Sequence, residues 1–317
     1  MRIVTSKIGE TVAFLLKESY KNGKRYMVFG KTTLSDNFRK IFETQKLDVS
    51  QLQSVHGGDI NDAYCVYTQT GKYFMKINHA RKYPEMFAKE AQGLQALRNN
   101  SQFTVPRVIA HGVSDADQYL ILEWIEQGQP RKDFALHFGR NLAAMHQLQQ
   151  PYFGFETDNY IGSLPQVNTQ HASWNTFYAQ CRILPLVKIL ADQEAFSGAD
   201  VKKAERFCER LSEIFPEEAP ALLHGDLWSG NYCVTADGYA AIYDPAVYYG
   251  HREMDLGMTL LFGGFPRAFY EAYHEYYPLE PNWRKRVAYT QLYPLLVHAI
   301  LFGGHYVHAV RETLSDF

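Results

Sequence analysis

The sequence predicts an α+β fold with two lobes, a small lobe built on an antiparallel sheet and a larger, mainly helical lobe. Alternating β-prone stretches gather in the first part of the chain, and stretches with apolar residues at helical spacing dominate the rest. A polar stretch with glycine and proline at residues 127–130 separates the two patterns. The predicted parts are an N-terminal extension of uncertain role at 1–33, an N-lobe at 34–126, a hinge or linker at 127–132 and a C-lobe at 133–317.

The N-lobe is expected to contain strands and one helix. CVYTQ at residues 65–69 and KYFMKIN at 72–78 are predicted strands, joined by a Thr-Gly turn. A helix is predicted in MFAKEAQGLQALR at residues 86–98 because four apolar residues share one face: Met86, Ala91, Leu94 and Leu97. A buried strand is predicted from Tyr119 to Ile125, where the polar linker begins.

The C-lobe is expected to be mainly helical, with helices at residues 137–147 and 199–215. Residues 153–185 between them show no regular period. Their mixture of aromatic and polar side chains suits two interpretations, a wall that binds a sugar or a loop packed on the core. The side chains concerned are Asn159, Gln166, Asn168, Trp174 and Arg182.

Composition and charge indicate which partners and which cellular location to expect for the chain. A net charge of -2 over 317 residues argues against nucleic acid. The most apolar stretch, Tyr293–Val310, contains three histidines and Gly303-Gly304, which favours a pair of helices in the C-lobe over a membrane span. Charges interrupt the first twenty residues, so no signal peptide is expected. The four cysteines form no paired motif, which favours a cytoplasmic location.

The most informative motif is LLHGDLWSGN at residues 222–231, followed by Asp244 in AIYDPA. An aspartate, an asparagine five residues later and a second aspartate beyond a short hairpin form a spacing that phosphoryl transfer requires. Asp226 is the predicted catalytic base. Asn231 and Asp244 are the predicted ligands of the magnesium ion that bridges the phosphates of ATP. The motif therefore predicts a small-molecule kinase.

The hairpin between the two metal ligands has a predicted register. Asp237 and Gly238 suit a two-residue turn. If Ala236 pairs with Tyr239 across that turn, Asn231 lies opposite Asp244, with Cβ atoms about 5 Å apart. Without the motif upstream, the same residues would suit a surface turn and an ordinary carboxylate at the end of a strand.

A second group of residues suits ATP binding. Gly57 and Gly58 in SVHGGDINDAY permit the backbone to approach phosphates closely. Lys76, on the strand that follows, is expected to pair with Glu90 of the predicted helix. Each of these residues alone is more commonly a turn glycine or a solvated charge, so the prediction depends on their order along the chain. Main-chain groups at the end of the buried strand predicted from Tyr119 are expected to bind adenine. They belong to Glu123, Trp124, Ile125 and Glu126.

The chain from about residue 34 onward resembles the fructosamine kinase (ketosamine-3-kinase) family, a branch of the aminoglycoside phosphotransferase-like kinases. Three segments carry the resemblance: NYIGSLPQVN at 159–168, HGDLWSGN at 224–231 and DPAVYYGHREMDLG at 244–257. Trp228 and Pro245 are the most specific, because aminoglycoside and choline kinases share the HGD and asparagine positions but lack the YGxRExDL continuation.

The resemblance implies a bilobal protein-kinase-like fold and an ATP- and Mg²⁺-dependent kinase that phosphorylates the 3-position of ketosamines, as in deglycation repair. It implies that Trp228 and Glu253 lie near the substrate, and that Arg252, Glu253 and Asp255 brace the catalytic hairpin. The implied substrates are small ketosamines or glycated protein lysines, without nucleic acid or membrane partners. The oligomeric state is open, with a monomer favoured.

Two features depart from the family pattern and two alternatives remain. His56 occupies a place in the glycine-rich loop where the family often has a small residue, and residues 1–33 precede the usual start of the family. The alternatives are a kinase of an aminoglycoside or another amino sugar, and a pseudokinase that serves as a binding module.

Overall fold

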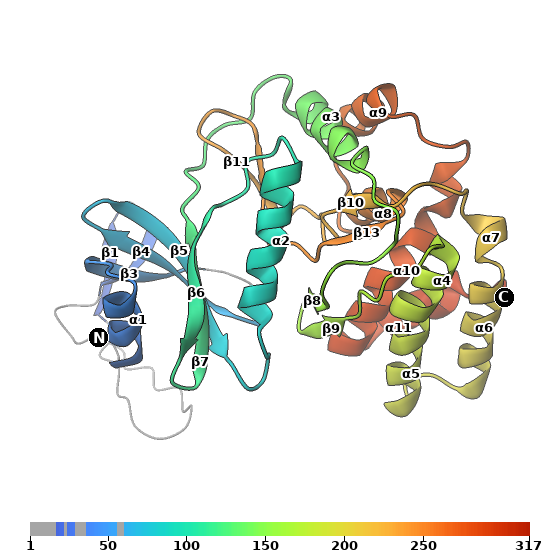
Figure 1. The fold of residues 1–317 in the computed structure, drawn as a ribbon, viewed down its shortest axis with the longest axis horizontal. Coiled ribbons are helices and arrows are strands. Elements are labelled where there is room, and N and C mark those ends of the chain that lie inside the picture. Colours follow the sequence, from blue (N-terminus) through green and yellow to red (C-terminus); the bar gives the residue numbers. More distant parts are fainter. Residues whose placement is uncertain (1–16, 22–23, 29–35, 56–59) are drawn as a thin grey trace. The chain divides into compact units, whose positions relative to one another are not determined.

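The computed structural model describes residues 17–21, 24–28, 36–55 and 60–317, with side chains from residue 36 onward. The chain divides into two compact units (Figure 1). The first contains Met1–Phe87 and Val108–Trp124, and the second contains Ala88–Arg107 and Ile125–Phe317. Residues 88–107 therefore group with the second unit, whereas the sequence suggested a continuous N-lobe through residue 126.

The first unit is built on a five-stranded antiparallel sheet with the strand order β3-β4-β5-β7-β6. Its strands are β3 (Val49–Val55), β4 (Asp62–Thr68), β5 (Gly71–His79), β6 (Val108–Ser114) and β7 (Asp117–Glu123). Helix α1 (Asp36–Thr44) buries Ile41 and Phe42 against the sheet, in a core with Met75 and Ile121. A separate hairpin pairs β1 (Lys17–Lys21) with β2 (Lys24–Val28).

Tight turns set the ends of these strands. The predicted β4–β5 hairpin is confirmed, but Thr68 pairs with Gly71, so the turn lies one residue earlier than expected. Strand β7 begins two residues before the predicted Tyr119, because Ser114 pairs with Asp117 across a two-residue turn. Asp115 in that turn has φ +53°, a conformation that aspartate tolerates better than most residues.

The second unit is mainly helical, as predicted. Its long helices are α2 (Met86–Asn100, from residue 88 onward), α3 (Phe134–His146), α5 (Leu184–Asp192), α6 (Gly198–Glu209), α8 (Glu253–Leu261), α9 (Arg267–Tyr276), α10 (Trp283–Phe302) and α11 (His305–Thr313). The predicted apolar faces of α2 and α3 are buried; Leu97 and Leu142 have no exposed surface. The shorter α4 (Trp174–Tyr178) continues through a π-helical turn, Ala179–Ile183, into α5.

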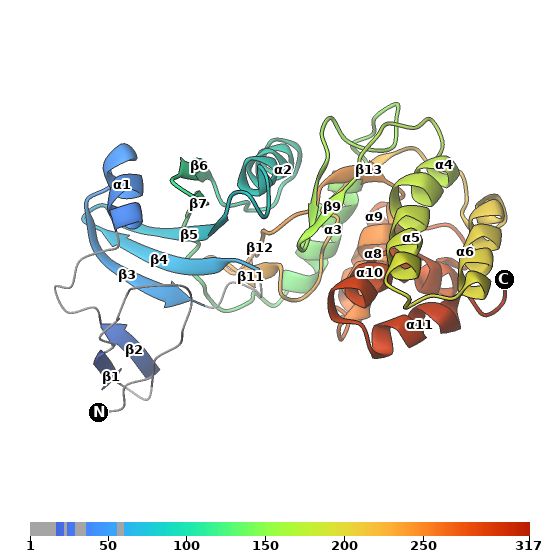
Figure 2. The ribbon, with the colours of Figure 1, turned by 90° about the horizontal axis from the view of Figure 1, so that it is seen from below.

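The helix predicted at residues 199–215 is divided. Helix α6 ends at Glu209, and a short α7 (Leu211–Ile214) follows Arg210, whose N–H donates to the Phe207 carbonyl in a tightened last turn. The apolar period continues across the break because Phe207 and Leu211 are buried in one core. Helices α5, α6, α10 and α11 surround this core (Figure 2).

The predicted pair of helices in Tyr293–Val310 is confirmed, since α10 and α11 are separated by Gly303 and Gly304. None of the helices in the described part of the chain combines the length and apolar character that a membrane span needs.

Three short antiparallel hairpins or strand pairs complete the second unit. They are β8 (Asn159–Ile161) with β9 (Leu164–Gln166), β10 (Ala221–Leu223) with β13 (Tyr248–Gly250), and β11 (Tyr232–Val234) with β12 (Ala240–Ile242). The HGD motif begins directly after β10, so these strands position the candidate site.

Candidate active site

The HGD loop crosses the main chain beyond β12 at very short range. Gly225 has φ +84°, and a Cβ atom at this position would overlap the carbonyl oxygen of Ala246. Only glycine fits both conditions. The crossing is fixed by the N–H of Ala246, which donates to the His224 carbonyl at 2.9 Å. Gly225 thus places Asp226 beside the segment that carries Asp244.

Asn231 joins the predicted catalytic residues. Its Nδ2 donates to the Asp226 carboxylate at 3.0 Å, to the Asp226 carbonyl at 2.8 Å and to the Asp244 carbonyl at 3.4 Å. Because these partners are all acceptors, the amide orientation is determined by the network. Its Oδ1 accepts no hydrogen bond from the described residues, and an amide oxygen is a suitable magnesium ligand.

The predicted register of the hairpin is wrong by one residue. Tyr232 pairs with Ile242, and Tyr243 rather than Asp244 lies opposite Asn231, with its N–H donating to the Asn231 carbonyl at 3.0 Å. The cause is the turn. Thr235 pairs with Tyr239 around a three-residue loop that ends at Gly238, whose φ is +86°. This is the loop type with a left-handed glycine and a bulge, not the expected two-residue turn.

Asp244 occupies the first position beyond this paired segment. Its φ is +56°, in the left-handed region that residues other than glycine rarely adopt. Such strained residues cluster at functional sites. The turn at Asp244 redirects the chain toward the Ala246 crossing, and therefore brings Asp244 to the Asn231 amide without a cross-strand pair.

The carboxyl group of Asp226 has an unusual affinity for protons. Burial raises its pKa to about 7; the hydrogen bond from Asn231 opposes this shift, while the nearby carboxylates of Asp244 and Asp255 add to it. A carboxyl group with a pKa near neutrality suits general-base catalysis.

Asp255, near the start of α8, accepts hydrogen bonds from the main chain of the HGD loop. Its two carboxylate oxygens accept hydrogen bonds from the N–H groups of His224 at 2.8 Å and Gly225 at 2.9 Å. His146 Nε2 lies 3.2 Å from the same carboxylate, and its Nδ1 lies 2.8 Å from the Tyr273 hydroxyl. Asp255 therefore braces the HGD loop, and not the hairpin that the resemblance implied.

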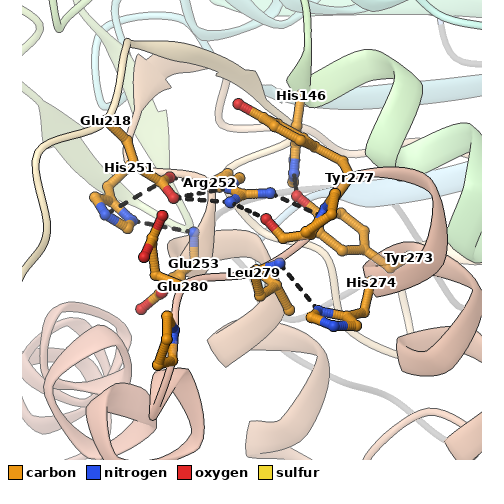
Figure 3. A network of polar contacts seen from close by, with 12 residues as sticks. His146, Glu218, His251, Arg252, Glu253, Tyr273, His274, Tyr277, Leu279 and Glu280 are labelled. Atoms are coloured by element: carbon orange, nitrogen blue, oxygen red, sulfur yellow. Dashed lines mark hydrogen bonds and ion pairs between the residues drawn. The ribbon is translucent and has the colours of Figure 1, made fainter.

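Arg252, the residue just before α8, ties the start of this helix to other segments (Figure 3). Arg252 makes a bidentate ion pair with Glu218, donates to the carbonyls of Tyr277 and Pro278, and stacks on the Tyr277 ring. Burial alone would raise the pKa of Glu218, but the hydrogen bonds from Arg252 hold it below its usual value. Arg252 therefore braces the start of α8, whereas Asp255 contacts the HGD loop.

The two predicted substrate residues have different surroundings. Trp228 is half-buried, and its ring makes an edge contact with Phe262 at 5.6 Å between centroids. Glu253 is only 1% exposed, and Arg286 Nε donates to its carboxylate at 2.8 Å. This ion pair favours a structural role for Glu253 over the predicted contact with substrate.

Of the two interpretations of residues 153–185, the structure supports a loop packed on the core and not a sugar-binding wall, because the five polar and aromatic side chains concerned are all buried. Gln166 donates to the Asn159 side chain at 2.7 Å, and Asn159 donates to the Val247 carbonyl at 2.8 Å. The fully buried Arg182 donates to Asn168 at 2.7 Å and lies 4.2 Å above the Tyr248 ring. This group, which we call the amide network, comprises Asn159, Gln166, Asn168 and Arg182. It supports the main chain at Ala246 and Val247, two and three residues beyond Asp244.

The residues predicted to bind ATP belong to both units. Lys76 is a buried residue of the central strand β5, and Glu90 is a half-buried residue of α2. Glu123 ends β7, and the chain passes from the first unit to the second between Trp124 and Ile125. The predicted linker at 127–132 is instead paired with the second unit, since Gly128 donates to the Val234 carbonyl. Gly57, Gly58 and His56 lie outside the described residues.

Comparisons with known proteins show which family the chain resembles along most of its length. A family model described as fructosamine kinase matches residues 32–317. The chain is 42% identical over 276 residues to a probable ketoamine kinase of Synechocystis, covering 86% of this chain and 92% of the relative. It is 37% identical over 280 residues to the chloroplastic protein-ribulosamine 3-kinase of Oryza sativa, covering 87% and 81% of the two chains.

The fold is similar to a solved structure from Thermobifida fusca assigned as a fructosamine-3-kinase. The TM-score is 0.79 at 36% sequence identity, and the match covers 89% of this chain and 97% of that one. The predicted α+β fold with a bilobal, protein-kinase-like arrangement of elements is therefore confirmed.

Proposed function

The chain belongs to the fructosamine kinase family, and on this premise we propose that it transfers the γ-phosphoryl group of ATP to the 3-hydroxyl of a ketosamine. Fructosamine and ribulosamine adducts of small amines or protein lysines are the proposed substrates. The name of the rice relative supports the 3-position. The proposed role is removal of such adducts by phosphorylation.

The observation that carries this proposal is the hydrogen-bonded group formed by Asp226, Asn231 and the Asp244 main chain. It combines a carboxyl group whose pKa is about 7 with an available amide oxygen and a second aspartate held in a strained turn. A binding module without catalysis would have no need for this combination. The geometry thus supports an active enzyme over a pseudokinase.

Each residue has a defined part in the proposed reaction. Asp226 accepts the proton of the sugar hydroxyl while the hydroxyl oxygen bonds to the γ-phosphorus and the bond to the β–γ bridging oxygen breaks, releasing ADP. Asn231, through Oδ1, and Asp244 are the proposed magnesium ligands, and the bound ion would neutralise phosphate charge.

The nucleotide is proposed to be held by the remaining predicted residues. Lys76 and Glu90 are the proposed phosphate-positioning pair. The main chain at Glu123–Glu126 is the proposed adenine contact, and Gly57 and Gly58 the proposed phosphate loop.

A substrate screen tests the proposal. The purified chain with ATP and Mg²⁺ is given fructosyl-lysine, ribulosyl-lysine and kanamycin, with free lysine as the control. We expect phosphorylation of at least one ketosamine and little or none of kanamycin, with the phosphate placed on the third carbon by NMR. A higher kcat/KM for kanamycin would change the substrate assignment but keep the kinase mechanism. Absence of turnover with every compound would favour the pseudokinase.

A further inference from the structure

A continuous set of aromatic rings begins at the catalytic loop. The ring centroids of Trp228 and Phe262 are 5.6 Å apart, and those of Phe262 and His298 are 5.1 Å apart. His298 also contacts Phe302 at 5.6 Å and Tyr306 at 5.0 Å. We call these five residues the aromatic row. They come from the HGD loop, the end of α8, and helices α10 and α11.

The aromatic row is open to solvent along its length. Phe302 is 58% exposed, and the other four side chains keep part of their surface exposed. Gly263 and Gly303, which follow Phe262 and Phe302 in the chain, have open space where a Cβ atom would lie. Exposed, contiguous apolar surfaces of this kind commonly mark binding sites.

The row starts beside the predicted base. The N–H of Trp228 donates to the Asp226 carbonyl at 3.2 Å, so a tight turn brings the main chain of Trp228 next to Asp226. In a ketosamine, three carbon atoms separate the nitrogen from the 3-oxygen. With bonds of about 1.5 Å, these two atoms lie at most about 5 Å apart. A 3-hydroxyl held at Asp226 therefore leaves the amine within reach of Trp228.

The surroundings of the row suit one cation with an apolar substituent. No Asp, Glu, Lys or Arg occurs between Asp255 and Arg267 or between Arg286 and Arg311, the two stretches that supply Phe262, His298, Phe302 and Tyr306. An alkylammonium group can bind to ring faces through cation–π contacts without a carboxylate partner. A molecule with several ammonium groups would lack the carboxylates it needs.

His298 adds a polar contact to the row. Its Nδ1 lies 2.7 Å from the Pro294 carbonyl, and because a carbonyl only accepts, Nδ1–H donates. Burial lowers the pKa of His298, which favours the neutral ring. Its Nε2 is then an acceptor, and no described residue donates to it.

We propose that the aromatic row binds the amine side of the ketosamine. The protonated nitrogen lies against the rings near Trp228, one of its N–H groups donates to His298 Nε2, and its alkyl chain extends toward Phe302. This inference rests on the proposed function and assigns the part of the site that distinguishes a ketosamine from an uncharged ketose derivative. A glycated lysine carries such an alkyl chain.

A pair of substrates isolates the effect of the charge. One is fructose with a butylamino group on its first carbon, and the other is the ether in which oxygen replaces the NH. Phe262→Leu keeps the apolar volume but removes a ring, so we expect it to lower kcat/KM for the amine by ~3- to 30-fold. For the ether we expect a change of less than about threefold. Tyr276→Leu, at a 47% exposed ring on α9, is the control and should affect neither substrate.

The outer end of the row is tested separately. Phe302→Ser should lower kcat/KM for the butylamino substrate but not for its methylamino counterpart, and its high exposure makes a folding defect easy to exclude by thermal melting. Equal losses on amine and ether with Phe262→Leu, or no loss with either variant, would overturn the proposed binding site alone. Absence of ketosamine phosphorylation by the wild type would instead overturn the proposed function.

Discussion

Two aspartates of the second unit have pKa values that move in opposite directions: Asp226, a half-buried residue of the HGD loop, and Asp255, a buried residue that contacts this loop. Asp226 receives one side-chain hydrogen bond, from Asn231, and its pKa rises to about 7. Asp255 accepts hydrogen bonds from two main-chain N–H groups and lies beside His146, and its pKa falls below the usual value despite burial. Asp255 has more hydrogen-bond donors and lies beside histidines, whereas Asp226 lies near two other carboxylates, and both differences act in the same direction.

The two aspartates differ in the same way as a proposed catalytic base and a supporting carboxylate would. Asp226, with few partners, is suited to accept a proton. Asp255 is held charged and immobile, and it fixes the two residues that precede Asp226 in the loop. Two other carboxylates near α8 are also held by ion pairs. Glu218 pairs with Arg252, and Glu253 pairs with Arg286.

The largest effect is expected for Asp226→Asn. Loss of a general base typically lowers the rate by a factor of ~100 to 10,000. Because the variant keeps the shape of the side chain, binding of ATP and magnesium should remain close to that of the wild type. Steady-state kinetics and nucleotide titration measure the two quantities. Asp192→Asn, on the exposed face of α5, is the control. A variant that kept more than a tenth of the wild-type rate would exclude Asp226 as the base.

Asp255→Asn should act mainly on stability. The amide cannot accept hydrogen bonds at both of its terminal atoms, so it leaves one of the N–H groups of His224 and Gly225 without its partner. We expect the free energy of unfolding to fall by about 3 kcal/mol, the upper end for a hydrogen bond to a charged group. Urea unfolding provides the measurement. An unchanged midpoint, together with a rate as low as that of Asp226→Asn, would place Asp255 in the chemistry instead.

Asp244→Asn should differ from both variants in its response to magnesium. Removal of a carboxylate ligand is expected to weaken apparent magnesium affinity by at least about tenfold, the smaller effect seen for outer-shell partners. Higher magnesium concentrations should therefore restore part of the activity. Identical magnesium dependence in variant and wild type would remove Asp244 from the metal site.

The sequence predicted the parts of this site that depend on local spacing. Asp226, Asn231 and Asp244 were identified because their separation along the chain is short, and the apolar faces of α2 and α3 follow from helical periodicity. The hairpin register was not predictable from Asp237 and Gly238, because the same dipeptide suits a two-residue turn or the end of a three-residue loop.

Burial and distant contacts were less accessible to sequence analysis. Asn159 and Gln166 look the same in sequence whether they face a sugar or one another, and only the tertiary structure shows that they form the amide network. Phe262 and His298 were not singled out, since nothing local links them to Trp228. The HGD motif is enough to locate the proposed reaction centre, whereas the residues that position it and the proposed amine site are brought together by helices far apart in the chain.

The smallest expected effect is the pH dependence of the stability that Asp255 provides. Burial alone would raise its pKa, but the hydrogen bond and charge of His146, together with His224 and the Gly225 N–H, lower it overall. A carboxyl group with a lower pKa in the folded state stabilises the fold fully above its unfolded pKa of about 3.9 and loses this contribution as the pH falls through the folded value. The difference in unfolding free energy between wild type and Asp255→Asn should therefore be constant from pH 5 to 7 and decrease below about pH 4. Urea titrations at a series of pH values measure it. A difference that grew on acidification would mean that Asp255 is protonated more readily in the folded chain, which would remove the contrast with Asp226.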